Sequence, residues 1–261
     1  PLFEWGSNRS KQVVQDKRRL ELFHRLQSLL DQRDRPDPIQ VERIKPQLFE
    51  QFYRVNRPCV LTQWADSWQA FKKPWSAERL GSEFASVSIE VTEGREGRAD
   101  FDRNAHLLKR QTSLGTFAQR VIECREPSND FYLIARNFAL DHPLLLELLE
   151  EIDESPFLDP KRRSKHVALW FGPQGTYTPL HHDTCNIMFV QMWGEKRIDL
   201  LPPYRQDLFE TSHNMYASLD LRASPQPEQR TVILKPGEAL FIPVGWWHQV
   251  EALSASTSLA M

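Results

Sequence analysis

The sequence predicts a mainly β protein with a helical N-terminal part, and two observations support this fold class. Short apolar runs follow one another from about Phe131 onward, and most of them end at a glycine or proline corner. Strands of this length and spacing are typical of an antiparallel sandwich or barrel. The chain also has 18 prolines against 10 glycines, and 8 tryptophans, which favours short strands and tight corners over a helical bundle. The predicted strands are FYLIA (131–135), HVALWF (166–171), NIMFVQMW (186–193), RIDLLP (197–202), TVILK (231–235), ALFIPV (239–244) and WWHQVEAL (246–253).

We expect the 261-residue chain to have two parts, a helical and mixed part at 1–125 that packs on a β-barrel at 126–261. Residues 11–33 carry apolar side chains at helical spacing, and Pro36 and Pro38 end this pattern. Further helices are predicted at 46–56, 76–84, 113–124 and 141–150, with Ser76 and Asp141 as N-caps. Strands are predicted at 59–62 and 87–91, and a charged, mobile loop that borders a binding site at 93–103.

The charge balance indicates neither a nucleic-acid nor a membrane partner. Lysine and arginine number 33 against 35 aspartate and glutamate residues, so the formal net charge is −2. No apolar run reaches the roughly 18 residues that span a bilayer, and no signal-peptide pattern opens the chain. The 3 cysteines lie far apart and form no disulfide framework. We therefore expect a reducing compartment, the cytoplasm.

The segment TPLHHD (178–183) contains a candidate pair of metal ligands. In a strand, His181 and Asp183 point to one face and His182 to the other. An imidazole and a carboxylate side by side can hold two adjacent positions on a divalent metal. A His-x-Asp pair is also a common structural feature, so a third ligand on another strand is needed to support a metal site.

His248 is the candidate third ligand. Tight turns at Pro236-Gly237 and at Pro243-Val244-Gly245 flank a short apolar strand and deliver His248 to a fixed place, on one face with Trp246 and Val250. Two histidines and one carboxylate form the facial triad of non-haem Fe(II) oxygenases, which leaves three metal positions open. Zinc accepts the same ligands, so the ligand types alone do not choose the metal.

Lys196 shares a strand face with Ile198 and Leu200, just after the corner at Gly194. A lysine on an apolar face points inward, where its ammonium group is costly unless an anion meets it. A dicarboxylate co-substrate would supply that anion; the alternative is a lysine that extends to water at a hairpin end. Four tryptophans are candidate walls of the cavity, although each also suits plain core packing: Trp170, Trp193, Trp246 and Trp247.

Three segments carry a family resemblance: FGPQGTYTPLHHD (171–183), QMWGEKRIDLLPP (191–203) and VILKPGEALFIPVGWWHQVEAL (232–253). They resemble the JmjC/cupin-like family of Fe(II)- and 2-oxoglutarate-dependent oxygenases, in particular its hydroxylase branch, typified by the factor-inhibiting-HIF asparaginyl hydroxylase. A weaker match, RVNRPCVLTQWADSW (54–68) followed by KPWSAERL (73–80), resembles the N-terminal portion of the same group. The implied fold is a double-stranded β-helix, a jelly-roll barrel with the metal in its mouth.

The resemblance also implies roles for single residues. Iron would be bound by His181, Asp183 and His248. The distal carboxylate of 2-oxoglutarate would pair with Lys196, assisted by the hydroxyls of Thr178 and Tyr132. Many members carry an asparagine four residues after the aspartate; Ile187 holds that position here, so either Asn186 stands in or this contact is absent.

The resemblance predicts a dioxygenase that uses Fe(II), 2-oxoglutarate and O₂, releases succinate, and hydroxylates an amino-acid side chain of a protein or peptide. Histone-type demethylation is disfavoured because no reader module accompanies the barrel. The open alternatives are hydroxylation of a small metabolite or a modified tRNA base, a zinc-dependent cupin enzyme, and a catalytically silent cupin that only binds ligands. The dimer-forming C-terminal helices of some members are missing, so we expect a monomer or an N-terminally mediated dimer.

Overall fold

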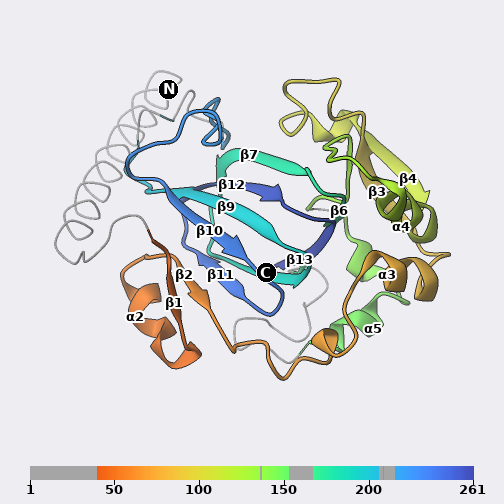
Figure 1. The fold of residues 1–261 in the computed structure, drawn as a ribbon, viewed down its shortest axis with the longest axis horizontal. Coiled ribbons are helices and arrows are strands. Elements are labelled where there is room, and N and C mark those ends of the chain that lie inside the picture. The colour runs from red at the N-terminus through yellow and green to blue at the C-terminus, as the bar shows by residue number, and fades with distance from the viewer. Residues whose placement is uncertain (1–39, 136, 153–166, 206–207, 209–214) are drawn as a thin grey trace, which may run out of the picture.

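Two facing β-sheets form the centre of the protein in the computed structural model (Figure 1), which describes residues 40–135, 137–152, 167–205, 208 and 215–261. The N-terminal elements are β1 (Glu42–Ile44), η1 (Pro46–Leu48), α2 (Phe49–Arg54), β2 (Cys59–Leu61), η2 (Gln69–Phe71), α3 (Ala77–Glu83), β3 (Ser88–Glu93), η3 (Ala105–Leu107), β4 (Lys109–Ser113) and α4 (Leu114–Glu123). They are followed by β5 (Phe131–Tyr132), η4 (Ala139–Asp141), α5 (Leu146–Leu149), β6 (Ala168–Gly172), β7 (Tyr177–His182), β8 (Ile187–Trp193), β9 (Lys196–Leu201), β10 (Arg230–Leu234), β11 (Ala239–Ile242), β12 (Trp247–Ala252) and β13 (Ser256–Ala260).

Strands β6 to β13 make a jelly roll. One sheet contains the strands in the order β11-β8-β13-β6 and the other in the order β10-β9-β12-β7, and neighbouring strands are antiparallel. With the single exception of β9 and β10, successive strands lie in opposite sheets, so the chain winds around a common interior. This is the double-stranded β-helix of cupins, and the predicted fold class is confirmed.

Apolar side chains fill the space between the two sheets. The first sheet contributes residues such as Phe189 and Leu240, and the second contributes Ile198, Leu200 and Val250. These residues alternate along their strands with residues of the opposite face, as expected for sheets that are covered on both sides. The larger core lies on the outer face of the first sheet, where the N-terminal elements pack.

The N-terminal part both extends and covers the first sheet. β2 pairs antiparallel with β11 and parallel with β1, so the sheet continues to six strands. Helices α3, α4 and α5 lie beside β6, next to a small sheet in the order β4-β3-β5 (Figure 1). The division of the chain at residue 125 stays a prediction, although β2 hydrogen-bonds directly to the barrel strand β11.

Most predicted N-terminal elements are present. Helices occur within 46–56, 76–84 and 113–124, and strands at 59–61 and 88–93. The hydroxyl of Ser76 accepts a hydrogen bond from the amide of Arg79, as expected of an N-cap. The FYLIA run forms the two-residue β5, which pairs with β3, and meets the barrel through an isolated bridge between Leu133 and Phe171 of β6. The predicted helix at 11–33 lies outside the described residues.

The predicted helix at 141–150 is confirmed only at its C-terminal end, and the predicted N-cap Asp141 is wrong. Asp141 ends the short 3₁₀-helix η4, and α5 covers only Leu146–Leu149, without a side-chain cap. The reason is Pro143: the residue before a proline is driven toward extended backbone, and His142 has φ −68° and ψ 130°. This break separates the two helical pieces.

The charged loop at 93–103 is anchored near its start by a buried arginine, which the expectation of a charged, mobile loop did not include. Arg95 has a relative exposure of 0%. Its guanidinium donates to the carbonyl of Asn129 at 3.0 Å, to the carbonyl of Tyr177 at 2.7 Å and to the hydroxyl of Thr92 at 3.3 Å. A buried arginine with this many acceptors holds the loop against the first residue of β7, Tyr177.

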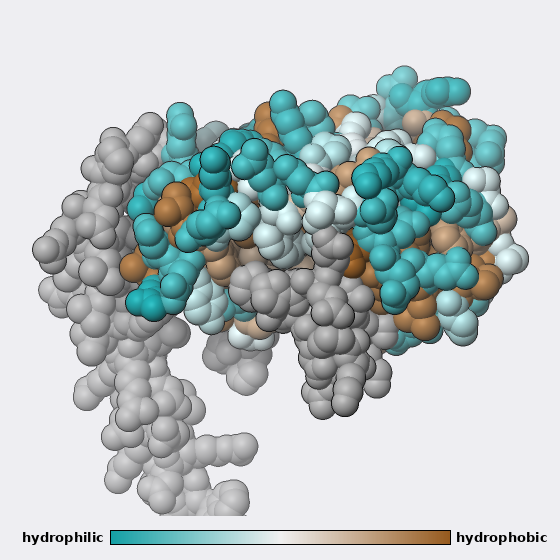
Figure 2. All heavy atoms as spheres, turned by 90° about the horizontal axis from the view of Figure 1, so that it is seen from below, coloured by the Kyte–Doolittle hydropathy of each residue, from teal (hydrophilic) through white to brown (hydrophobic). Residues whose placement is uncertain are grey.

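Hydrophilic side chains cover most of the described surface on the face shown in Figure 2, and apolar side chains gather there in small groups. Within the described parts of the chain, no helix has the length and apolar character that crossing a bilayer requires.

Candidate metal and co-substrate site

The three predicted metal ligands converge at one end of the barrel. His181 on β7 lies directly across from His248 on β12, and their ring centroids are 4.1 Å apart. Asp183 follows β7 immediately, and its Oδ2 is 3.5 Å from Nε2 of His248. One ligand atom from each residue lies within 4.8 Å of the other two. The arrangement therefore fits a single divalent cation.

Hydrogen bonds to the backbone orient both imidazoles. Nδ1 of His181 is 2.8 Å from the carbonyl oxygen of Pro179, and Nδ1 of His248 is 3.0 Å from that of Trp246. A carbonyl only accepts, so each Nδ1 carries the proton and each Nε2 keeps its lone pair for a metal. Burial also lowers the pKa of His248 well below its usual value, which keeps this ring neutral.

A register shift in β7 brings Thr178 to the interior face that also carries His181 and His248. His181 pairs with His248 and Thr178 pairs with Val250, so three steps on β7 match two on β12. Without this bulge, Thr178 and His181 would point to opposite faces. Pro179 lies inside the shifted stretch, where its missing amide is tolerated. Thr178 is 5% exposed and shares the interior face with the ligands.

Lys196 points into the barrel, as its strand position predicts. It is 0% exposed, and its Nζ donates to the hydroxyl of Tyr132 at 3.0 Å. Among the described residues no carboxylate forms an ion pair with it. Burial lowers the pKa of Lys196 to about 7. An ammonium group in this place can hold an anion that enters the barrel.

Asn186 is not brought to Lys196 and Tyr132. Its Oδ1 accepts a hydrogen bond of 2.8 Å from the amide of Val244, at the corner that precedes His248. The neighbouring Ile187 packs against the apolar interior. Asn186 thus connects the start of β8 to the turn that delivers a metal ligand.

Two of the four candidate wall tryptophans face the interior. Trp170 and Trp246 belong to the interior cluster. Trp247 packs outside the second sheet, edge-on to His182. The prediction for Trp193 is wrong because β8 and β13 shift register beside it, which turns Trp193 to the outer face, where it packs against the larger core.

Sequence reasoning missed two residues beside the metal ligands. The ring of Tyr216 lies 5.6 Å from the ring of His181, and burial together with the neighbouring Asp102 carboxylate raises the pKa of the Tyr216 hydroxyl. Asp102 lies in the loop that was expected to border a binding site, but nothing in its local pattern sets it apart. Tyr216 lies in no apolar run, so no periodicity could identify it.

This combination of a jelly-roll barrel, a His-x-Asp…His cluster at its mouth and a buried lysine inside defines the JmjC cupin class. Enzymes of this class are oxygenases that use Fe(II), 2-oxoglutarate and O₂. The His181, Asp183 and His248 donor set fits Fe(II), which prefers two imidazoles and one carboxylate.

The chain belongs to the family of cupin-like domains, whose model matches residues 45–261. It is 39% identical over 225 residues to the lysine-specific demethylase JMJ30 of Arabidopsis thaliana, covering 80% of this chain and 50% of that protein. The lysine-specific demethylase 8 of Xenopus tropicalis is 29% identical over 234 residues, 81% of this chain and 49% of that protein. HSPB1-associated protein 1 of Homo sapiens is 32% identical over 127 residues, 42% of this chain and 26% of that protein. The chain thus spans about half of these relatives or less, and its similarity to the asparaginyl hydroxylase branch stays a prediction.

The state of Lys196 predicts how 2-oxoglutarate affinity depends on pH. A bound carboxylate favours the ammonium form and raises the pKa of Lys196 from its value of about 7. Binding above pH 7 therefore takes up a proton, and the affinity is expected to fall by up to about tenfold per pH unit. Calorimetric titration at several pH values in buffers of different ionisation enthalpy measures both the affinity and the proton uptake. An affinity that is constant from pH 7 to pH 9 would contradict this assignment.

Proposed function

We propose that this protein is an Fe(II)- and 2-oxoglutarate-dependent oxygenase that hydroxylates an amino-acid side chain of a protein or peptide. The observation that carries the proposal is the shared interior of the metal cluster and the buried lysine. His181 and His248 lie in one cross-strand row. On β9, Leu200 is the residue that pairs with His248. Lys196 lies four residues before Leu200 on the same strand and projects from the same interior face.

Each residue has a role that follows from its place. His181, Asp183 and His248 would hold the iron. Lys196, with Tyr132 bonded to it, would bind the distal carboxylate of 2-oxoglutarate, and the Thr178 hydroxyl lies on the same face to assist. When bound, iron and 2-oxoglutarate supply the oxidising power, and the reaction converts a C–H bond, 2-oxoglutarate and O₂ into C–OH, succinate and CO₂.

The residues of the chain contribute orientation and exclusion of water. The backbone carbonyls at Pro179 and Trp246 fix the two imidazoles. The apolar interior around Phe189, Ile198 and Val250 keeps water away from the surroundings of Lys196, which strengthens the interaction of a bound co-substrate with Lys196.

A macromolecular substrate is favoured by the open side of the site. Asp183 keeps 30% of its side-chain surface exposed, whereas His248 keeps 5%. A side chain of a peptide can therefore approach the metal from the Asp183 side. The names of two relatives, both lysine-specific demethylases, favour a second candidate reaction, oxidation of a methyl group on lysine. Asn186 stays a weaker candidate for co-substrate binding because its oxygen is already bonded.

Mass spectrometry of peptides after reaction tests the proposal. Peptide mixtures with unmodified and methylated side chains are incubated with the protein, Fe(II) and 2-oxoglutarate in air, and succinate is measured in parallel. We expect succinate formation coupled to a peptide that gains the mass of one oxygen atom. A peptide that loses one CH₂ unit would favour demethylation instead, and succinate that only a small metabolite stimulates would contradict a protein substrate. Reactions without 2-oxoglutarate are the control.

A further inference from the structure

Residues 215–222, which we call the edge segment, flank the metal site on the side of His181. β7 is the outermost strand of its sheet. His248 on β12 therefore has strands on both sides, whereas His181 on β7 has a barrel strand on one side. The edge segment supplies the missing neighbour, because Tyr216 forms an isolated antiparallel bridge with His181.

Backbone hydrogen bonds fix this pairing. The amide of His182 donates to the carbonyl of Met215 at 3.0 Å, and the amide of Ala217 donates to the carbonyl of Leu180 at 2.8 Å. These two bonds flank the bridge, so the side chain of Tyr216 falls on the same side as His181.

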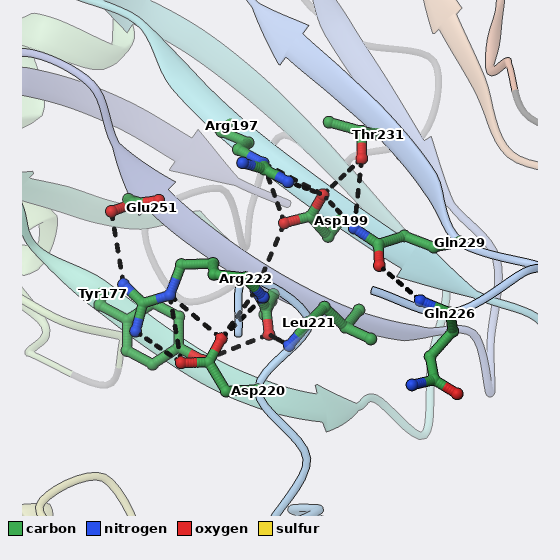
Figure 3. A network of polar contacts seen from close by, with 11 residues as sticks. Tyr177, Arg197, Asp199, Asp220, Leu221, Arg222, Gln226, Gln229, Thr231 and Glu251 are labelled. Atoms are coloured by element: carbon green, nitrogen blue, oxygen red, sulfur yellow. Dashed lines mark hydrogen bonds and ion pairs between the residues drawn. The ribbon is translucent and has the colours of Figure 1, made fainter. Parts of the chain in front are cut away.

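Polar contacts outside the barrel hold the far end of the edge segment (Figure 3). The amide of Leu221 donates to Oε1 of Gln249 at 3.0 Å. Arg222 lies 3.6 Å above the ring centre of Tyr177 and pairs with Glu251 at 3.3 Å. Gln249 follows the metal ligand His248 directly, so the edge segment and this ligand are anchored to the same strand.

A chain of three polar side chains, Arg95, Asp102 and Tyr216, holds the near end. The hydroxyl of Tyr216 faces the Asp102 carboxylate, and burial together with this carboxylate raises the pKa of the hydroxyl. Asp102 also lies 3.5 Å from the guanidinium of Arg95. The Arg95 and Asp102 side chains are 0% and 7% exposed, and Arg103 adds a bond of 3.4 Å to the carbonyl of Tyr216. Segments more than a hundred residues apart thus meet at one metal ligand.

We propose that Tyr216 is a positioning residue for His181, and that Asp102 and Arg95 act through it. The ring of Tyr216 covers an imidazole at a sheet edge, and the Asp102 carboxylate beside its hydroxyl holds this ring in place. The carbonyl of Pro179 already holds one edge of this imidazole, and a wall against its face restricts its rotation further, so the wall raises metal affinity. The proposal rests on the proposed metal centre and not on any substrate.

Mn(II) titrations of the metal-free protein, followed by electron paramagnetic resonance of the unbound ion, test the proposal. Tyr216→Phe keeps the ring but removes the hydroxyl that faces Asp102, and Asp102→Asn alters the same contact from the other side. We expect each variant to bind Mn(II) about tenfold more weakly, the lower end of the range for groups that orient a metal ligand. Because both substitutions remove the same contact, the Mn(II) affinity of the double variant is also expected to fall by about tenfold. Tyr53→Phe, at a tyrosine that is 51% exposed on α2, is the matched control.

Melting temperatures measured alongside separate positioning from loss of fold. Asp102→Asn leaves Arg95 without its carboxylate and is expected to lower the melting temperature, whereas Tyr216→Phe retains that ion pair and the wild-type melting temperature. Wild-type Mn(II) affinity in Tyr216→Phe, or losses that multiply in the double variant, would overturn the proposal and leave the metal centre standing. Absence of Mn(II) binding by the wild-type protein would overturn the metal centre as well.

Discussion

Replacing Lys196 by methionine is expected to stabilise the cofactor-free protein and to abolish its tight binding of 2-oxoglutarate. The ammonium group is fully buried, and the Tyr132 hydroxyl is the hydrogen-bond partner that it has among the described residues. Burial of a cation without a carboxylate costs free energy, and this cost appears as the lowered pKa of about 7. Methionine has a similar length, fills irregular apolar space and carries no charge.

The sign of the pH dependence follows from the pKa of Lys196 in the folded protein, about 7 against the ordinary 10.5. Between these values the unfolded chain holds the proton and the folded chain does not, so the wild-type free energy of unfolding rises with pH. The gain from Lys196→Met is therefore largest at and below pH 7 and disappears near pH 10.5. At neutral pH we expect Lys196→Met to raise the free energy of unfolding by roughly 1 to 4 kcal/mol. Each kcal/mol should raise the melting temperature by about 2–4 °C.

Thermal melts with and without 2-oxoglutarate, in the presence of a redox-inert divalent metal, measure both effects together. The wild type should gain stability from 2-oxoglutarate, and the variant should lose this response because its affinity falls by about 100-fold, the value of a charged hydrogen bond. Lys235→Met, at an exposed lysine after β10, is the control and should change neither quantity. A variant that melts lower than the wild type, or that still responds to 2-oxoglutarate, would contradict the assigned role.

The barrel and most of the residues of the site could be predicted because their evidence is local. Alternation along a strand separates His181 from His182 without knowledge of the partner strand, and it places Lys196 with Ile198 on the interior face. The turns that precede His248 are likewise predicted by prolines and glycines that lie close together in the sequence. Local rules of this kind hold wherever a strand keeps its register.

Local patterns do not suffice where a distant segment of the chain decides the arrangement. Trp193 changes face because β8 slips by one residue against β13, and Thr178 reaches the interior only through the bulge against β12. Arg95 is buried because acceptors from residues 129 and 177 surround it. Tyr216 covers His181 through a pairing between segments that no local pattern links. None of these arrangements has a signature within a window of ten residues.

Two adjacent histidines provide the sharpest test of the metal centre. His181→Ala is expected to remove tight metal binding, because two ligands cannot define the facial arrangement that three provide. The same substitution at His182 is expected to preserve it, because this ring points to the outer face and packs edge-on to Trp247 with centroids 4.7 Å apart. Asp183→Ala is expected to behave as His181→Ala does.

Anaerobic titration with Fe(II) and 2-oxoglutarate, read through the visible charge-transfer band, measures binding before any turnover occurs. The wild type and His182→Ala should develop the band, and succinate should form when air is admitted. His181→Ala and Asp183→Ala should require at least about 100-fold more Fe(II), since loss of a direct ligand exceeds the effect of its supporting groups. If His181→Ala and His182→Ala weakened Fe(II) binding equally, the site would depend on the packing of β7 and not on the identity of the metal ligand. A band that survives in Asp183→Ala would remove the carboxylate from the centre, since no other carboxylate among the described residues groups with the two imidazoles.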